Sequence, residues 1–178
     1  MIRRTATGDR DRLLAFAEAL PEHDLLFLGR DLKHPRVVDA WVAATEEGTI
    51  DSLLDEAEDG AVCGTAALIR DPLGWSAHVG EVRLLVAPAA RGGGVGRRLL
   101  AEVIRIAAEE HGLAKLSAKM TPDQRGAIEL FESMGFRGEA MLRDQVADRQ
   151  GQRHDLAILS LDLERDASRR EAFGLMAE

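Results

Sequence analysis

"LLVAPAARGGGVGRRLLAEVI", residues 84–104, joins an apolar strand-like run to a helix-like run through three consecutive glycines and a fourth. Glycine weakens regular structure, so a cluster at this junction indicates that something approaches the main chain closely. A strand that enters a glycine-rich turn and then a helix offers free amides and the positive end of a helix dipole. The stretch therefore favours an anion-binding loop, with a purely structural glycine turn as the alternative.

Two common phosphate-binding patterns do not fit this loop. A dinucleotide fingerprint requires Gly-x-Gly-x-x-Gly within a strand–helix–strand unit, and "GGVGRR" has no glycine at the third required place. The Gly-Lys-Ser/Thr of a P-loop is also missing from the sequence. If the loop binds an anion, it does so through another arrangement.

Composition predicts one soluble domain over residues 1–163 and a tail over 164–178 that is helical or disordered. The chain has 178 residues, of which 46% are hydrophobic and 30% charged. No apolar run approaches the ~20 residues of a membrane span, so we expect no membrane partner. A formal net charge of −8 argues against general nucleic-acid binding. The single cysteine, Cys63, excludes an internal disulfide and agrees with a cytoplasmic location.

Hydrophobic periodicity predicts a mixed α/β protein with helices on both faces of its sheet. We expect strands near 2–6, 49–57, 61–71, 78–87, 113–120, 136–146 and 153–163, and helices near 9–20, 35–48, 94–111 and 121–135. The last helix has a capping-box pattern, with Thr121 as N-cap and Gln124 three residues later. His23 lies between the first two helices, where a solvated loop is the favoured interpretation.

Two motifs with their spacing resemble the GNAT superfamily of N-acetyltransferases. "RGGGVG" (residues 91–96) fits that family's acetyl-CoA motif, Arg/Gln-x-x-Gly-x-Gly/Ala, and "GAIELFESMGF" (residues 126–136) is similar to its second signature. One predicted helix and one predicted strand separate them. The resemblance covers residues 61–163 well and the N-terminal third by element order only.

The resemblance implies a mixed, mostly antiparallel, twisted sheet of six or seven strands that is splayed at its centre, with acetyl-CoA in the opening. The Leu84 amide would then face the thioester oxygen and stabilise the oxyanion, which gives Leu84 a catalytic role. The loop amides would receive the pyrophosphate. The cofactor-binding residues implied in this way are Leu84, Leu85, Val86, Arg91, Gly92, Gly93, Gly94, Val95, Gly96, Arg97, Gln124 and Phe131.

The general base departs from the family pattern. Members often carry a glutamate on this strand, six residues before the position of Val86, and that position is Gly80 here. Glu81 follows, and a shift of one residue turns a side chain to the opposite face. Two interpretations of Glu81 remain. A β-bulge near Gly80 could turn its side chain back toward the amine, which would make it the base, or it is a surface charge. His78 lies two residues before Gly80, so its side chain is expected on the same face of the strand. It is either the alternative base or an ordinary histidine at the end of a strand.

The general acid departs as well. The family's tyrosine in the second signature is usually assigned to protonating the CoA thiolate, and Phe131 stands in its place. Phenylalanine has no ionisable group, and the chain contains no tyrosine. Either the thiolate leaves without a protein acid or Ser133 or another donor reaches it, while Phe131 packs beside the sulfur.

We conclude from the sequence that the protein is an acetyl-CoA-dependent N-acetyltransferase. In this interpretation a primary amine of a small molecule or peptide attacks the thioester directly. The alternative is a catalytically weak acyl-CoA-binding sensor or regulatory module. We expect no metal, because no cluster has metal-ligand spacing, and a homodimer is compatible with the resemblance.

Overall fold

The computed structural model describes residues 1–164, so the predicted tail lies outside the described residues apart from Glu164. Strands of the described chain form one sheet in the order β1-β2-β3-β4-β5-β7-β6. They are β1 (Ile2–Arg4), β2 (Ile50–Glu56), β3 (Val62–Ile69), β4 (Val79–Val86), β5 (Lys115–Met120), β6 (Arg137–Ala147) and β7 (Arg153–Asp162). Among the strand pairs of residues 1–164, only β4–β5 is parallel, which confirms the predicted mixed, mostly antiparallel sheet.

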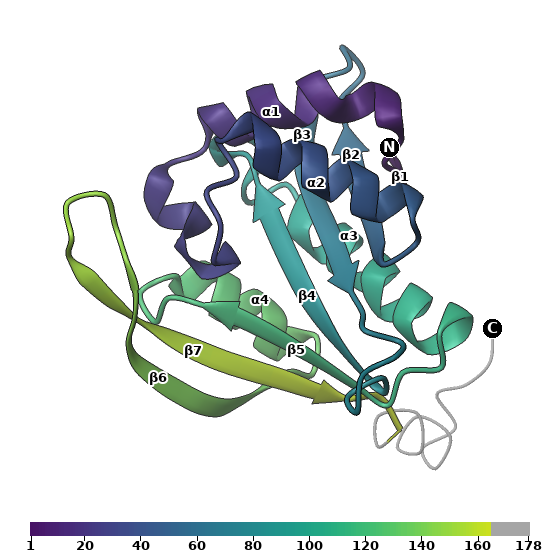
Figure 1. The fold of residues 1–178 in the computed structure, drawn as a ribbon, viewed down its shortest axis with the longest axis vertical. Coiled ribbons are helices and arrows are strands. Elements are labelled where there is room, and N and C mark those ends of the chain that lie inside the picture. The colour runs from purple at the N-terminus through teal and green to yellow at the C-terminus, as the bar shows by residue number, and fades with distance from the viewer. Residues whose placement is uncertain (165–178) are drawn as a thin grey trace.

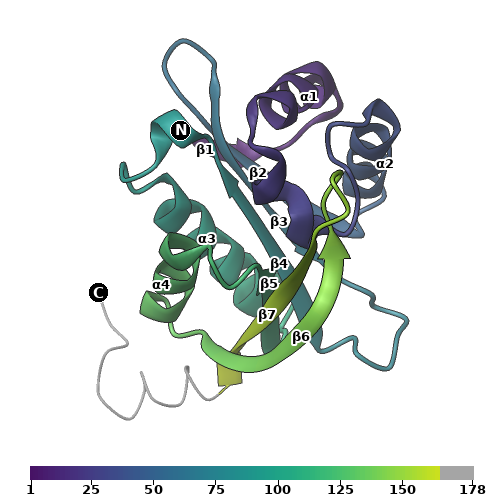
Figure 2. The ribbon, with the colours of Figure 1, turned by 90° about the vertical axis from the view of Figure 1, so that its left-hand side faces the viewer.

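Helices cover both faces of the sheet (Figure 2). α1 (Arg10–Ala19) and α2 (Pro35–Glu46) pack on one face, and α3 (Val95–Arg105) and α4 (Arg125–Ser133) on the other. α3 continues into a π-helical turn, η4 (Ile106–Glu110), and short 3₁₀ turns η1 (Thr7–Asp9) and η3 (Pro88–Ala90) precede α1 and the glycine loop. A longer 3₁₀ segment, η2 (Glu22–Leu28), lies beside β5 and β6. No helix of the described chain combines the length and apolar character that crossing a membrane requires.

Alternate residues of β4 belong to two separate cores. Val82 is buried in the cluster beneath α3 and α4, and Leu84 packs against the same cluster. Leu85 is buried in the other cluster, beneath α1, α2 and η2. This alternation follows from the two-residue period of a strand, and it places neighbouring side chains of β4 on opposite faces.

The sheet opens between β4 and β5. Their pairing begins at Val79 with Lys115 and ends at Val82 with Ala118. Beyond that point β4 continues to pair with β3, and β5 continues to pair with β7, as far as Met120. Figure 1 shows the two strands diverging. The predicted central splay is therefore confirmed.

The start of α4 differs from the predicted capping box. The Gln124 side chain does accept from the Thr121 amide, at 3.2 Å, but α4 begins only at Arg125. Thr121 is buried, and its hydroxyl lies 3.2 Å from His23 Nε2 instead of capping the helix. A contact with a distant segment thus replaces half of the local motif.

Candidate functional site

The loop between β4 and α3 needs glycine at two positions because of its backbone. Gly92 has φ +77° and Gly94 has φ +79°, a left-handed conformation that residues with a Cβ rarely adopt. Gly94 directly precedes α3, so the loop leads into the first turn of that helix. The free amides of this turn and the positive end of the helix dipole make it a place where anions are stabilised.

Gly96 has a different reason to be glycine. A Cβ at Gly96 would lie 2.9 Å from Cδ2 of Leu130 on α4 and 3.5 Å from Cγ2 of Val86. The sequence interpretation explained every glycine of the loop by access to phosphate. The structure shows instead that Gly96 lets α3 pack closely against α4 and β4.

A cavity of about 730 Å³ occupies the opening between β4, the glycine loop, β5 and α4. Its walls include nearly all the residues predicted to bind the cofactor: Leu84, Leu85, Val86, Arg91, Gly92, Gly94, Val95, Gly96, Arg97, Gln124 and Phe131. Gly93 belongs to the loop but does not line the cavity, and its carbonyl accepts from Arg98 at 3.1 Å. The fold thus brings both sequence motifs to one cavity.

Cations outnumber carboxylates on the walls of this cavity. Arg91, Arg97, Lys119 and Arg125 line it, together with Asp24 and Asp123. The guanidinium of Arg91 donates to Asp24 and to the Val86 carbonyl, the latter at 3.3 Å. The excess of positive charge is of the sign that a pyrophosphate requires.

Phe131 lines the cavity and belongs to the core at the same time. It is 3% exposed, and its ring meets that of Phe136 edge to face with centroids 4.9 Å apart. Ser133 is exposed, donates to the Leu130 carbonyl at 2.7 Å and accepts from Arg97 at 2.8 Å. Ser133 does not line the cavity, so the structure does not bring this candidate acid to the site.

η2 contacts both walls of the cavity, which the sequence did not reveal. His23 Nε2 lies 2.8 Å from an oxygen of Asp123, in the turn before α4, and 3.2 Å from the Thr121 hydroxyl. The next residue, Asp24, pairs with Arg91 on the glycine loop. His23 is therefore a cavity residue and not the solvated loop histidine that the sequence favoured.

Glu81 lies in a second hollow, of about 700 Å³, on the face of η2 and β6. Lys119 Nζ is 2.9 Å and Arg83 Nε is 2.8 Å from its two carboxylate oxygens. Burial raises the pKa of Glu81, but the hydrogen bonds from Lys119 and Arg83 outweigh burial and hold the pKa below its usual value. Lys119 lines both the hollow and the larger cavity, so the two are adjacent.

Glu81 reaches this hollow without a bulge. The pairing of β3 with β4 is regular from Glu81 to Val86. A Cβ at Gly80 would lie 2.6 Å from a methyl of Leu68 and 2.8 Å from one of Leu113, so a glutamate there would enter the core. The family position is closed in this chain, and the neighbouring carboxylate faces the side on which η2 lies.

His78 is not brought to either space. It is exposed in the turn before β4 and lines neither the cavity nor the hollow. Its carbonyl accepts from the amides of Ala114 and Lys115, at the end of β4 remote from the glycine loop. The structure therefore does not place this candidate base at the cavity, because His78 lies at the far end of the strand.

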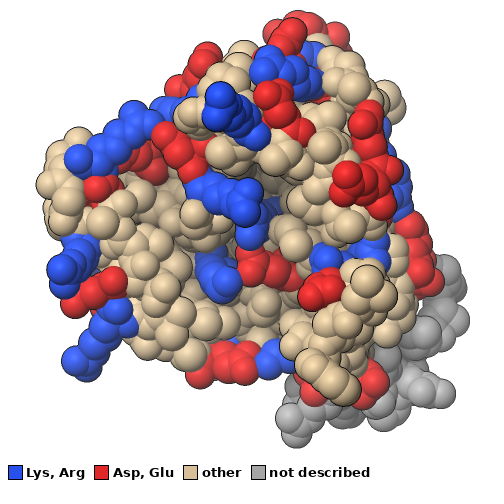
Figure 3. Space-filling view, in the orientation of Figure 1, with Lys and Arg blue, Asp and Glu red and all other residues tan. Residues whose placement is uncertain are grey.

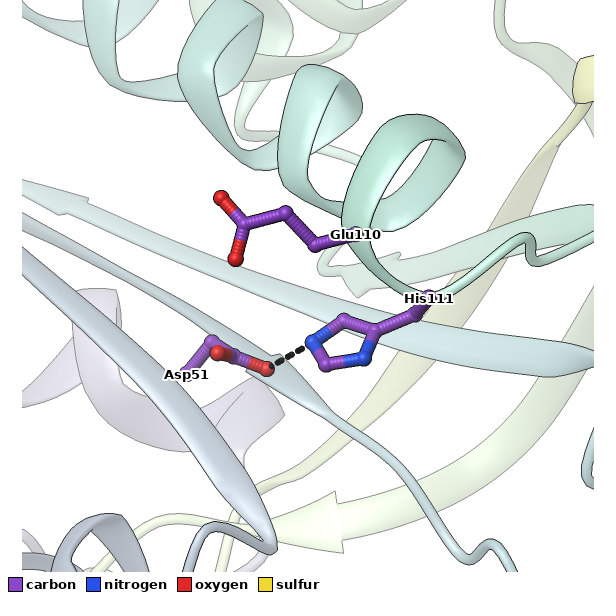
Figure 4. A group of neighbouring side chains, drawn as sticks. All are labelled: Asp51, Glu110 and His111. Carbon is purple, nitrogen blue, oxygen red and sulfur yellow. Dashed lines mark hydrogen bonds and ion pairs between the residues drawn. The ribbon is translucent and has the colours of Figure 1, made fainter.

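Asp51, Glu110 and His111 gather in space although their sequence spacing gave no metal signature (Figure 4). Their possible ligand atoms lie within 4.8 Å of one another. His111 Nε2 contacts an Asp51 oxygen at 2.7 Å, and Arg4 and Arg70 donate to the same carboxylate at 2.7 and 3.1 Å. Arg4 also pairs with Glu110. Arginines already compensate these carboxylates, so the group is an ion-pair network that joins β1, β2, the residue after β3 and the end of η4.

Comparison with known proteins agrees with this geometry. Residues 11–136 match the model of the acetyltransferase (GNAT) family. The chain belongs to the GNAT acetyltransferase family. A relative named "Putative phosphinothricin acetyltransferase YwnH", from Bacillus subtilis (strain 168), is 39% identical over 83 residues, which are 47% of this chain and 50% of that protein. The chain thus matches half the length of this relative.

Solved structures extend the likeness to almost the whole chain. The ribosomal-protein-alanine N-acetyltransferase from Brucella melitensis superposes with a TM-score of 0.76 and 27% identity, over 91% of this GNAT chain and 99% of that one. The yncA structure from Salmonella typhimurium, which was determined with its cofactor acetyl-CoA, gives a TM-score of 0.74 and 25% identity over 92% and 93% of the two chains. The fold is that of a GNAT N-acetyltransferase.

Proposed function

We propose that the protein transfers an acetyl group from acetyl-CoA to a primary amine by direct attack of the amine on the thioester. The observation that carries this proposal is the opening between β4 and β5 with the glycine loop at its end. Bare backbone at Gly92 and Gly94, a helix N-terminus and several arginines together fit a pyrophosphate, and the splayed strands fit an extended pantetheine arm.

Distinct parts of the chain would hold distinct parts of acetyl-CoA. The amides of residues 92–97 would receive the pyrophosphate, and the edge of β4 from Leu84 to Val86, which β5 leaves unpaired, would bind the pantetheine. Phe131 offers an apolar wall of the same cavity. When bound, acetyl-CoA supplies the activated acetyl group.

Two groups of the chain would then act on the reacting atoms. The Leu84 amide donates to the thioester oxygen and stabilises the negative charge that develops there. Glu81, whose pKa lies below its usual value, is ionised at neutral pH and takes the proton that the amine loses, directly or through water. Phe131 cannot protonate the sulfur, so the thiolate takes its proton from water.

Binding and turnover test the proposal separately. CoA at ~100 times its dissociation constant should raise the free energy of unfolding by about 2.7 kcal/mol, measured by thermal shift and calorimetric titration. Release of the CoA thiol is then followed with a panel of amines. No stabilisation at millimolar CoA would contradict the cofactor assignment, and tight binding without turnover for any amine would indicate a sensor or regulatory module.

Glu81→Gln tests the base. We expect a loss of turnover of roughly 10²–10⁴ with unchanged CoA affinity, and no loss in the control Glu129→Gln, since Glu129 is exposed on α4 and lines neither space. An unchanged rate in Glu81→Gln would remove it from the reaction. A cytoplasmic location and a homodimer stay predictions from the sequence.

A further inference from the structure

The hollow beside Glu81 contains more cations than this carboxylate can neutralise. Arg30, Arg83 and Lys119 all line it, and Glu81 is placed between Arg83 and Lys119. Arg149 also lines the hollow and pairs with both Glu22 and Asp31. Together the hollow holds four cations against three carboxylates, an excess of one positive charge. Figure 3 shows Lys and Arg atoms in the hollowed centre of this face. The hollow therefore has a positive excess in a chain of net charge −8, as the larger cavity does.

Several donors of these cations have no acceptor within residues 1–164. Arg83 uses only its Nε, towards Glu81, which leaves its two terminal nitrogens without a partner in this part of the chain. Arg30 follows Gly29, the left-handed residue that ends η2, and makes no hydrogen bond or ion pair with another described residue. A planar guanidinium with free terminal donors is suited to bind a carboxylate.

An apolar slot of about 300 Å³ adjoins the hollow beneath α2. Arg30 and Arg83 line both spaces, as does Leu28. The rest of the slot is mainly apolar and includes Leu32, Val37, Trp41, Ile50, Ala67 and Leu85. Leu85 also lines the larger cavity, so the slot, the hollow and the proposed acetyl-CoA cavity form a connected group of spaces.

We propose that the acceptor is a primary amine that carries both a carboxylate and an apolar side chain, as an apolar amino acid does. This inference rests on the proposed acetyltransferase function. Arg30 and Arg83 bind the carboxylate, the slot holds the apolar side chain, and Glu81 faces the amine. The same cations repel a polyamine, which brings only positive charge to the hollow.

The test compares amines that differ in one group. CoA release is measured with L-leucine, L-leucinamide and spermidine for the parent protein and for Arg30→Gln and Arg83→Gln. In the parent, kcat/KM for leucine should exceed that for leucinamide and spermidine. Each substitution should raise KM for leucine about tenfold, the loss of about one charge-assisted hydrogen bond. Arg30→Gln should leave KM and kcat for leucinamide unchanged. Arg83→Gln also removes a hydrogen bond from Glu81, so it should change kcat for leucine and leucinamide alike while leaving KM for leucinamide unchanged.

A control and a second variant separate charge from shape. Arg143 is exposed on β6 and lines neither the slot nor the hollow. Arg143→Gln therefore removes the same charge elsewhere, and this control should behave as the parent protein does. Ala44 lines the slot from α2, and Ala44→Leu keeps a good helix former while filling the slot. This variant should lose activity with leucine and keep its activity with glycine, which has no side chain to place.

The outcomes distinguish this inference from the proposed function. Equal or better turnover with spermidine or leucinamide, or an unchanged KM for leucine in both arginine variants, would overturn the acceptor class and leave the acetyltransferase intact. If no amine turns over, binding decides: leucine should still stabilise the CoA complex in a thermal shift more than leucinamide does. Equal stabilisation by the two compounds would overturn the inference.

Discussion

Gly64 controls how closely β3 approaches the start of α3, and replacing it tests the packing that shapes the cofactor cavity. A Cβ at Gly64 would lie 2.9 Å from the Leu85 carbonyl oxygen and 2.9 Å from Cγ1 of Val95. The first contact is with backbone, which cannot rotate away as a side chain can. Val95 and Leu85 both line the cavity, so any displacement changes its walls.

We expect Gly64→Ala to lower the free energy of unfolding by roughly 1–3 kcal/mol, the usual cost of one extra carbon in a well-packed core. For a protein of this size that corresponds to about 2–4 °C in Tm per kcal/mol. CoA affinity should fall as well, because the first turn of α3 is pushed from the position in which its amides face the cavity.

Gly138 provides a matched control. It also lies in a strand, on β6, and a Cβ there would have no neighbour within 4 Å. Gly138→Ala should leave CoA affinity unchanged and stability equal or slightly higher, since alanine restricts the unfolded chain. Urea unfolding and calorimetric CoA titration measure both quantities. A Gly64→Ala protein with the parent's midpoint and CoA affinity would refute the close approach of β3 and α3.

Three further predictions concern charge and the aromatic wall. The hydrogen bond from Arg3 holds the pKa of Asp9 at about 2 against a usual 3.8, so about 2 kcal/mol of stability should be lost as pH falls from about 5 to about 2. Urea unfolding at each pH should show this loss in the parent and its absence in Asp9→Asn. Asp24→Asn frees Arg91 from an ion pair and should tighten CoA binding a few-fold by titration, whereas weaker binding would contradict competition for Arg91. Phe131→Tyr should keep CoA affinity with equal or higher kcat, while Phe131→Ala should lose about 3–5 kcal/mol of stability.

Local sequence specifies the elements that frame the cavity. The glycine run, the helix that follows it and the second signature place the loop, α3 and α4, because glycine content and a 3.6-residue period act within a few residues. The contacts of η2 could not be predicted in this way. His23 meets Thr121 98 positions away, and Asp24 meets Arg91 67 positions away. No local pattern encodes such pairs, and the same holds for Arg30 and Arg83 at the slot.

The geometry of β4 explains how the proposed chemistry can proceed although Gly80 stands at the position of the family's glutamate. Its even-numbered side chains, such as Val82 and Leu84, pack toward α3, where a glutamate at position 80 would meet core leucines. Its odd-numbered side chains, Glu81 and Arg83, face the hollow instead. Since the strand period is two, a carboxylate one residue later serves the opposite face. In the proposed reaction the backbone edge of β4 binds the acetyl donor, and its odd-numbered side chains contact the acceptor. The position of this one strand in the sheet therefore determines where both reactants lie.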